Sequence, residues 1–365
     1  MKGIRLAIFA AVILTLSLSV SAQDVTEHYA EVYGAEAVED ALDAQTRSLM
    51  GELEPAKQAD IPKSIFSIVR NALAQSGGTI KDTFTSMIRL LLIVVLCQVA
   101  DAVVDERGKY VVILTGALAI VSCCVSDVRA MIEAGQSAIG EIADLTRVLL
   151  PVMVSAATAS GALSGATAVY TLTTAFSGVL IQFIDSFLLP AVYAYLALAL
   201  ADAASGQTRM KKLRELIGWG IEKTLKGTVY LFTGLLSVTG LLTGAADSAA
   251  LKATKSAVSG AVPVVGGILS GAADAVLSGA VLLKNAVGTY GMLAVFAIFI
   301  VPFLFIGSCY IMLKASAALC GIFSCAHSDL LEAISVALGY ILAMTASCAL
   351  MALISCCFFI KVVHI

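Results

Sequence analysis

The stretch that most restricts what this chain can fold into runs from Val258 to Gly291. It is mostly apolar, yet its bulk comes from Ala, Val and Gly rather than from Leu and Phe. Small residues recur at every fourth position, and on a helix they would form one smooth stripe: Gly267, Gly271, Ala275 and Gly279. Such a stripe lets a second helix approach closely, as membrane helices do where water cannot drive them together. The pattern therefore predicts a helix-packing surface.

Two charged residues accompany this stripe. Asp274 lies within it, and Lys284 lies near its end. A charge at membrane depth is costly and normally faces a protein interior or a water-filled cavity. The stretch is thus predicted to be a helix buried among other helices, not one that faces lipid.

The composition of the whole chain agrees with this interpretation. Hydrophobic residues make up 59% of the 365 residues and charged residues 13%, whereas soluble domains carry about 25% charged residues. The net charge of −3 is too small to indicate a nucleic-acid partner. We predict an all-α, polytopic helical membrane protein of about seven to nine spans, with a short N-terminal extracytoplasmic helical arm.

Two segments carry a resemblance to a known family. They are VPVVGGILSGAADAVLSGAVLLKNAVGTYG (Val262 to Gly291) and LLPVMVSAATASGALSGATAVY (Leu149 to Tyr170). Both resemble the characteristic segments of the stage III sporulation protein AE family of endospore-forming bacteria. The resemblance implies a multi-pass protein in the mother-cell membrane around the forespore, required for late forespore development. It also implies a complex that joins mother cell to forespore, with other membrane proteins of that complex and the lipid bilayer as partners.

The N-terminus has the pattern of a targeting segment. Lys2 and Arg5 precede an apolar run from Leu6 to Val20, and Val20 and Ala22 are the small residues that a signal peptidase reads. We predict a signal peptide over residues 1–22, because the run is shorter than the roughly 20 residues that a span needs. A retained first transmembrane helix is the alternative.

Residues 23–83 are predicted to form an extracytoplasmic arm. The part up to Asp60 is strongly acidic, and after Pro62 the apolar residues take helical spacing until Gly77-Gly78 interrupts the pattern. This indicates an amphipathic helix against the membrane surface or a partner. For the acidic part, a solvated linker and a partner-docking arm both remain open.

A transmembrane domain is predicted over residues 84–365. The first two spans, about Phe84–Val104 and Tyr110–Val125, are followed by a polar, helix-like loop that reaches Arg147. The apolar run Val148–Ala201 is long enough for two or three crossings. Breaks in this run are offered by Gly161 with Gly165, by Asp185-Ser186 and by Pro190. Further spans are expected at about Thr228–Ala245, Gly291–Leu313 and Ile334–Ile360. The side of the C-terminus stays open, because the Gly-rich element could either span or re-enter.

A basic segment over residues 205–226 orients the chain. Short basic loops stay in the cytoplasm, so this segment is predicted to be inside and the N-terminal arm outside. Its apolar residues share a helical face, which suits a helix in the membrane interface. The residues expected at this cytoplasmic interface are Lys211, Lys212, Arg214 and Trp219. A nucleic-acid or calmodulin-like interpretation is less favoured.

An internal echo links two parts of the chain. Residues 161–166 (GALSGA) match residues 267–272 (GILSGA) except at the second position, and a shorter copy lies at residues 242–247. Gly161 and Gly165 are therefore predicted to pack helices as Gly267 and Gly271 do. Gly/Pro-interrupted segments in two corresponding halves indicate a substrate path in transporters. Chance matching among small residues is the alternative to a duplication.

No motif for catalysis is present. A run that resembles a P-loop has Glu222 directly before Lys223, at a position where the motif requires glycine. The nine cysteines lie in or beside apolar segments, which argues against a disulfide framework. Cys320, Cys325 and His327 could form part of a metal site, but packing at a helix end is favoured. We expect no enzyme activity, no cofactor and no metal.

Charges within the apolar runs are the remaining candidates for function. Asp101, Asp202 and Lys284 are interpreted as marking helix ends, where charge reaches the interface at little cost. Asp185 and Asp274 lie deepest and are the candidate members of an intramembrane polar path or helix-pairing network.

Two classes of function follow. The first is a permease-like or scaffold subunit of the sporulation channel complex. The second is a stand-alone secondary transporter of a small solute, which the weak repeat and the two carboxylates keep open.

Overall fold

The computed structural model describes residues 36–51, 53–55, 57, 59–205, 210–261, 266–322 and 327–361. The described part is helical and contains no strand. Its elements are α3 (Glu36–Asp40), α4 (Ala44–Met50), α5 (Ile61–Val103), α6 (Glu106–Ala159), α7 (Leu163–Phe183), the π-helical turn η1 (Ile184–Leu188), α8 (Leu189–Ser205), α9 (Lys211–Ala261), α10 (Gly266–Ile322) and α11 (Ser328–Lys361). The predicted signal peptide, residues 1–22, lies outside the described residues.

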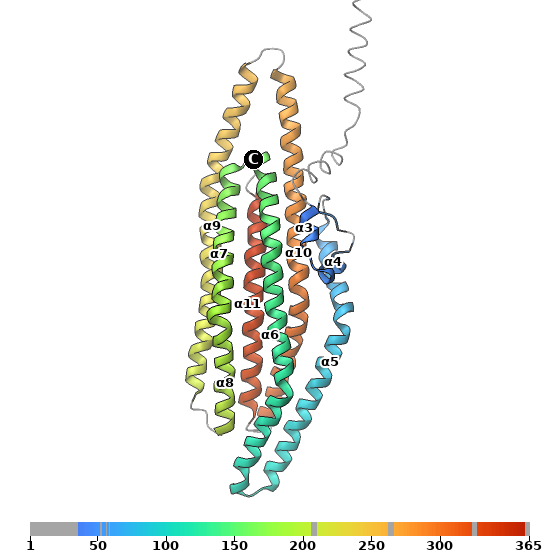
Figure 1. Cartoon of the computed structure of the whole chain (residues 1–365), viewed down its shortest axis with the longest axis vertical. Coiled ribbons are helices and arrows are strands. Elements are labelled where there is room, and N and C mark those ends of the chain that lie inside the picture. Colours follow the sequence, from blue (N-terminus) through green and yellow to red (C-terminus); the bar gives the residue numbers. More distant parts are fainter. Residues whose placement is uncertain are drawn as a thin grey trace, which may run out of the picture.

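The last helix forms the centre of the bundle. α11 contacts α6, α7, α8, α9 and α10, which stand around it as two long helical hairpins (Figure 1). In one hairpin α6 turns into α7 and α8, and in the other α9 is followed by α10. α5 lies outside this arrangement against α6 and α10. The offset of 106 residues in the sequence echo therefore relates α6 to α9 and α7 to the start of α10.

The helices are far longer than a bilayer is thick. The 54 residues of α6 rise about 80 Å, whereas the hydrocarbon core of a membrane measures about 30 Å. Within the described residues, five segments are long and apolar enough to cross a membrane: Lys81–Ala100, Gly108–Ala159, Leu163–Ser205, Ala280–Gly321 and Ser328–Lys361. Several apolar helices thus indicate a membrane protein, but the predicted seven to nine spans are not confirmed.

The polar segment predicted as a helix-like loop up to Arg147 is helical, but it is not a loop. Residues 127–147 belong to the uninterrupted helix α6, and the apolar residues from Val148 are its last turns. The error has a physical cause, because the charges of this segment lie on one face while Ile132, Ile142 and Leu145 are buried on the other. A pattern of this kind belongs to an amphipathic helix rather than to a loop.

Other expected breaks are also absent. α5 continues through Gly77-Gly78, α9 continues from the basic segment through the expected span, and α10 joins the Gly-rich element to the next apolar run. Neither glycine of the pair is crowded, since a Cβ there would meet nothing within 4 Å. Glycine lowers helix propensity by only about 1 kcal/mol, so packing on other helices overrides it.

Of the three breaks expected between Val148 and Ala201, only the one at Gly161 separates two helices. Gly161 has a φ of 91°. Its N–H bonds to Thr158 O, and the next N–H, of Ala162, bonds to Ala157 O, which is the hydrogen-bond pattern of a Schellman motif with glycine in the left-handed position. At Asp185-Ser186 the chain makes a π-helical turn instead, and Pro190 lies inside α8.

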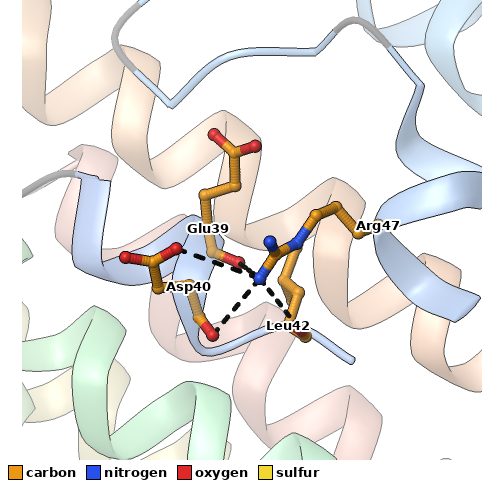
Figure 2. A network of polar contacts seen from close by, with 4 residues as sticks. All are labelled: Glu39, Asp40, Leu42 and Arg47. Carbon is orange, nitrogen blue, oxygen red and sulfur yellow. Dashed lines mark hydrogen bonds and ion pairs between the residues drawn. The ribbon is translucent and has the colours of Figure 1, made fainter. Parts of the chain in front are cut away.

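The acidic arm folds onto the bundle. α4 contacts α5 and α10, and α3 contacts α6. Figure 2 shows the contact that joins α4 to the end of α3: the guanidinium of Arg47 donates to the carbonyl oxygens of Glu39, Asp40 and Leu42 at 3.1, 3.4 and 3.2 Å. The carbonyls of Glu39 and Asp40 lie in the last turn of α3 and that of Leu42 lies just after it, and the Glu39 oxygen also accepts the N–H of Leu42 at 3.1 Å. The cation thus caps the C-terminal end of this short helix.

The arm lies beside the middle of the bundle, whereas α9, whose first part is the basic segment, begins nearer the end where α8 ends (Figure 1). Three rods separate them, namely α5, α6 and α7 with α8, and each runs antiparallel to the one before (Figure 1). α11 ends at Lys361, at the same end of the bundle as the α6–α7 turn (Figure 1).

Candidate functional site

The Gly-rich element is buried, as predicted, where its side chains are described. From Ala280 to Gly291 every residue is buried except Val281, Leu282 and Asn285. This part of α10 lies among α6, α9 and α11. The prediction of a helix surrounded by other helices is therefore confirmed for these residues.

Close helix packing occurs further along this element than the sequence indicated. A Cβ added to Gly291 would collide with the side chain of Leu149, and one on Gly288 would lie 2.7 Å from Ile360 Cγ1 and 2.9 Å from Met153 Cε. Both glycines thus let α6 and α11 press against α10. The surroundings of Gly267, Gly271, Ala275 and Gly279 lie outside the described side chains, so their role stays a prediction.

The other two predicted packing glycines differ from each other. Gly165 is buried in the first turn of α7, in keeping with a packing role. Gly161 lies instead in the turn between α6 and α7, so its interpretation as a helix-packing residue is wrong. Glycine is favoured at this position because residues with a side chain rarely adopt its positive φ.

Three more glycines at close contacts were missed. Gly116 accommodates His327 and Cys97, whose Nε2 and Sγ would lie 2.6 and 2.8 Å from an added Cβ. Gly135 receives the side chain of Ile341, and Gly218 receives the hydroxyl of Tyr340. None belongs to a repeated small-residue pattern, so no sequence signal distinguishes them from uncrowded glycines such as Gly140 and Gly220.

Lys284 does not mark a helix end. It lies well inside α10, its side chain is buried, and its Nζ donates to the carbonyl oxygen of Ile360 at 2.9 Å. Ile360 belongs to the last turn of α11, where carbonyls lack an intrahelical partner and the helix dipole is negative. The ammonium group therefore ties α10 to the C-terminal end of α11.

A second buried charge, Arg214 of α9, forms an ion pair with Asp202 of the preceding helix, α8. Asp202 of α8 accepts from Arg214 of α9 at 3.2 Å, and both side chains are less than a tenth exposed. The other carboxylate oxygen accepts from the N–H of Met210 at 2.9 Å. Arg214 also lies 6.0 Å from the ring centre of Tyr195, and Tyr340 meets that ring edge-on at 5.6 Å. We call Tyr195, Asp202, Arg214 and Tyr340 the α8–α9 junction.

The junction corrects one residue of the predicted cytoplasmic interface. Arg214 is buried, so it faces Asp202 rather than the surface. Lys211, Lys212 and Trp219 are exposed, as an interface position requires. The segment is the first part of the long helix α9, however, and not a separate helix. Later in this segment Lys226 bonds to Glu222, which lowers the pKa of that carboxyl.

Buried hydroxyl groups connect the central helix to its neighbours. Thr173 of α7 and Ser355 of α11 share a hydrogen bond of 2.8 Å. Thr345 of α11 donates to Gly135 O of α6 at 3.5 Å as well as to Ile341 O of its own helix. Bonds of this kind between membrane helices contribute up to about 1–2 kcal/mol each.

The two candidates for a polar path are not brought together. Asp185 is exposed on the π-helical turn, on the outside of the bundle. The side-chain surroundings of Asp274 lie outside the described part, as do those of Asp101. A polar path through these residues therefore stays a prediction.

His327 has a structural contact. Its Nε2 lies 3.0 Å from Ile113 O, and since a carbonyl only accepts, this nitrogen carries the proton. Cys320 is buried, and Cys325 lies outside the described residues. In the described ranges, no three His, Cys, Asp or Glu side chains are grouped so that they could hold a metal ion.

A comparison with protein families identifies the group. The model of "Stage III sporulation protein AE" matches residues 45–362, which is most of the chain. The chain belongs to this family. Among the family's described proteins, the stage III sporulation protein AE of Bacillus subtilis (strain 168) is 27% identical over 143 residues. That match covers 39% of this chain and 35% of the relative.

The relative thus matches over about a third of its own length. Membership of the family gives the chain a role in sporulation, and the resemblance noted from the sequence is confirmed. No solved structure matches this chain.

Proposed function

We propose that this stage III sporulation protein AE family member is a permease-like or scaffold subunit of a channel, or secretion-like, complex that links mother cell and forespore. In this proposal it resides in the mother-cell membrane around the forespore, is required for late forespore development, and catalyses no reaction. Membership of the sporulation family supports the setting. The geometry of the exposed apolar side chains supports the role of a subunit.

The observation that carries the proposal is an exposed apolar surface longer than a bilayer. One zone covers the hairpin of α5 and α6, where the exposed residues include Leu92, Leu96, Val99, Val111 and Leu118. A second zone, the apolar stripe of α9, consists of Tyr230, Leu231, Leu235 and Val238.

The levels of the two zones can be compared along α6. The rings of Phe232 of α9 and Phe176 of α7 lie 5.5 Å apart in a tilted arrangement. Ser177, next to Phe176, lines a small cavity together with Ala143 of α6. From Val111 to Ala143 α6 rises about 48 Å. A hydrocarbon core of about 30 Å cannot cover both zones, so one of them requires a protein partner.

The buried charges favour a scaffold over a carrier. Within the described residues, the buried charged side chains are Asp202, Arg214 and Lys284. All three bind other groups of the same chain: the pair closes the α8–α9 junction, and Lys284 holds the end of α11. These groups hold helices together, which is what a subunit of fixed shape needs.

The orientation follows from charge. The exposed Lys211 and Lys212 begin α9 at the cytoplasmic side, because basic flanks stay inside. The arm and the end of α11 then lie outside the cytoplasm. A reporter fused after residue 60 should behave as external and one near Lys212 as cytoplasmic, and a cytoplasmic signal at residue 60 would overturn this orientation.

Affinity purification of the full chain from sporulating cells tests the proposal. We expect it to copurify with several other membrane proteins of the envelope. A photoreactive amino acid at Leu96 and, separately, at Leu231 should capture protein at one position and lipid at the other. Recovery of a homogeneous species that transports a small solute alone would instead establish a secondary transporter.

A further inference from the structure

The hairpin of α5 and α6 projects past the start of α11 (Figure 1). Ile341 of α11 meets Gly135 of α6. Since these two helices run in the same direction, Ser328, the first residue of α11, lies level with about Ser122 of α6. The tip of the hairpin lies beyond that level, and its two outer sides are open to a neighbouring molecule.

One outer side of the hairpin is a stripe of exposed residues on α6. They recur every three or four positions, which on a helix places them on one side. From the tip onward they are Val111, Thr115, Leu118, Ser122, Val125, Arg129, Glu133, Gln136, Gly140 and Asp144. We call them the α6 stripe. It carries no charge up to Val125, and from Arg129 onward it is polar or charged apart from Gly140.

The other outer side is a similar stripe on α5. Its exposed residues, again three or four positions apart, are Ala102, Val99, Val95, Leu92, Ile88, Phe84, Lys81, Gly77, Leu73 and Arg70. We call them the α5 stripe. Between the two helices, Cys97 presses against Gly116. At about 100° per residue, Val95 and Leu118 each lie about 160° around their helix from these contact residues. The two stripes therefore face away from each other.

The stripes are in register along the hairpin. The contact between α5 and α6 marks one level, and the two antiparallel helices rise equally on either side of it. Val95 is therefore level with Leu118, and Ile88 is level with Val125. A second copy of the chain that stands beside the first at the same height would present its α6 stripe to the α5 stripe, residue for residue.

Residues at equal levels complement each other in size. Leu73 is level with Gly140, and Leu92 is within one position of the level of Ser122. Large side chains of the α5 stripe thus lie opposite small residues of the α6 stripe. Small residues and hydroxyl groups are the ones that let membrane helices approach closely.

Charges at equal levels are opposite in sign. Lys81 is within one position of the level of Glu133, and Arg70 is within one position of the level of Asp144. Each of these carboxylates bonds to one arginine of its own chain, at 2.9 and 2.7 Å. A carboxylate accepts more than one donor, so each can also bind a cation from a neighbouring copy.

A cavity beside the α5 stripe has room for side chains of a partner. Its volume is about 430 Å³, and it lies between α5 and the end of α10. Its lining is apolar apart from one amide: Leu91, Val94, Val95, Gln98, Val99, Leu319 and Cys320. Leu118 of a neighbouring copy, level with Val95, would enter this cavity. Large side chains that fill a pocket of the partner supply most of the binding energy of protein interfaces.

Lipid at the apolar stripe of α9 does not reach the hairpin. Ala143 of α6 is level with Phe232 of α9 through their contacts with α7. Val125 is then level with Arg214, which belongs to the basic segment at the cytoplasmic side. A bilayer at the apolar stripe thus leaves the exposed apolar residues of the hairpin to a protein partner.

We propose that copies of this chain stand side by side, with the α5 stripe of one copy packed against the α6 stripe of the next. The two stripes differ and face opposite sides, so the contact is heterologous and repeats around a ring or along a row. The inference rests on the proposed function, and it names a second copy of the chain as the partner of the hairpin.

Cysteine crosslinking between two differently tagged copies tests the contact in membranes from sporulating cells. One copy carries Val95→Cys and the other Leu118→Cys, which should meet. In the matched control, Leu231→Cys of α9 replaces Leu118→Cys, since these two leucines are 58 and 54% exposed. Copper–phenanthroline is the oxidant, and the unmodified chain, oxidised in parallel, corrects for its own cysteines.

We expect at least about tenfold more crosslinked product from Val95→Cys with Leu118→Cys than from the control, because a disulfide requires Cβ atoms within about 4.5 Å. Val95→Cys in both copies should give no more product than the control, since the α5 stripe does not meet itself. Equal yields from the test pair and the control would overturn the inference. Efficient crosslinking of Val95→Cys to itself would overturn the head-to-tail arrangement.

A charge reversal tests the register of the two stripes. Lys81→Glu in the copy with Val95→Cys should lower the crosslinked yield about two- to fivefold, as expected for the loss of an exposed ion pair. Glu133→Lys in the copy with Leu118→Cys should then restore the yield. A yield that stays low would overturn the register.

Copurification from the same cells separates this result from the proposed function. A multi-protein complex without the crosslink between copies contradicts only the side-by-side contact. Crosslinked copies that purify without other membrane proteins contradict only the proposed role in a multi-protein complex.

Discussion

The outer face of α6, where Arg129, Glu133, Gln136, Asp144 and Arg147 are exposed and which we call the hydrophilic face, reaches the level of the apolar stripe of α9 at its Asp144–Arg147 end. The two surfaces suit opposite surroundings. At Asp144 and Arg147 the outer surface is charged, whereas at Leu231 and Leu235 it is purely apolar. The inner sides do not differ in this way, since Leu145 and Phe232 are both fully buried. The comparison teaches that the exposed third of a helix, and not its mean hydropathy, decides which medium it touches.

The largest effect is expected where α9 is fixed to the bundle. Arg214→Met leaves Asp202 buried without its cation, which should lower the free energy of unfolding by about 3–5 kcal/mol. The variant should also loosen the packing of α9, with its apolar stripe, on the bundle. Thermal unfolding in detergent measures the loss. Lys211→Met, on an exposed neighbour, is the control, and adding Asp202→Asn to Arg214→Met should recover part of the stability. An unchanged melting temperature for Arg214→Met would contradict the assignment of this pair as a structural contact.

A charge on the apolar stripe should have the next largest effect. Leu235→Arg places a cation where lipid is expected, at a cost of about 2.5–3.5 kcal/mol near the centre of a membrane helix. Gln136→Arg adds the same group to the hydrophilic face and should be tolerated. The amount of each variant in the membrane fraction measures the difference. Equal amounts of both variants would remove the distinction between the two faces.

A smaller loss is expected from crowding the α8–α9 junction. In Gly218→Ala the new methyl group collides with the hydroxyl of Tyr340, whose ring is held edge-on by Tyr195. Overpacking of this kind costs about 1–3 kcal/mol. Gly220→Ala is the control, because a Cβ there meets nothing within 4 Å. Both variants are compared by thermal unfolding, and equal melting temperatures would contradict the close contact.

The smallest effect is expected on the hydrophilic face itself. Arg129→Gln removes an ion pair whose partners are both well exposed to solvent. Such pairs contribute little or nothing measurable to stability. We expect unchanged unfolding, with any defect confined to sporulation efficiency. A clear drop in melting temperature would show that Arg129 holds the fold together instead of lining a wet surface.

Local sequence chemistry predicted part of this molecule. The turn at Gly161 and the burial of the Gly-rich element after Ala280 follow from residues close together in the chain. The segment from Asp127 to Arg147 has a helix-like pattern, but its density of charged residues favoured a loop over a continuous helix. Helical spacing of the buried Ile132, Ile142 and Leu145 was the signal that identifies an amphipathic helix there.

The candidate site depended on contacts that the sequence does not contain. Arg214 and Asp202 each stand beside a helix terminus, and nothing local states that they pair across the turn rather than reach the surface. Lys284 meets Ile360 across 76 positions of the chain. Gly116 and Gly218 are crowded by single side chains from distant helices, so their role depends on how the helices pack and not on a repeated pattern.

The π-helical turn at Ile184–Leu188 changes the rotational phase of the rod that contains it. Exposure on α7 recurs at Gly178, Gln182 and Asp185, and without interruption the next outward positions would be near Leu189 and Val192. Those two are buried, and Pro190 and Tyr193 are exposed in their place. The pattern has advanced by one residue, or about 100° around the axis. The turn is equivalent to a one-residue insertion in an α-helix, so a single deletion within it would rotate α8 and its Asp202 away from Arg214. A deletion at this turn therefore acts as a change of helix rotation rather than of loop length.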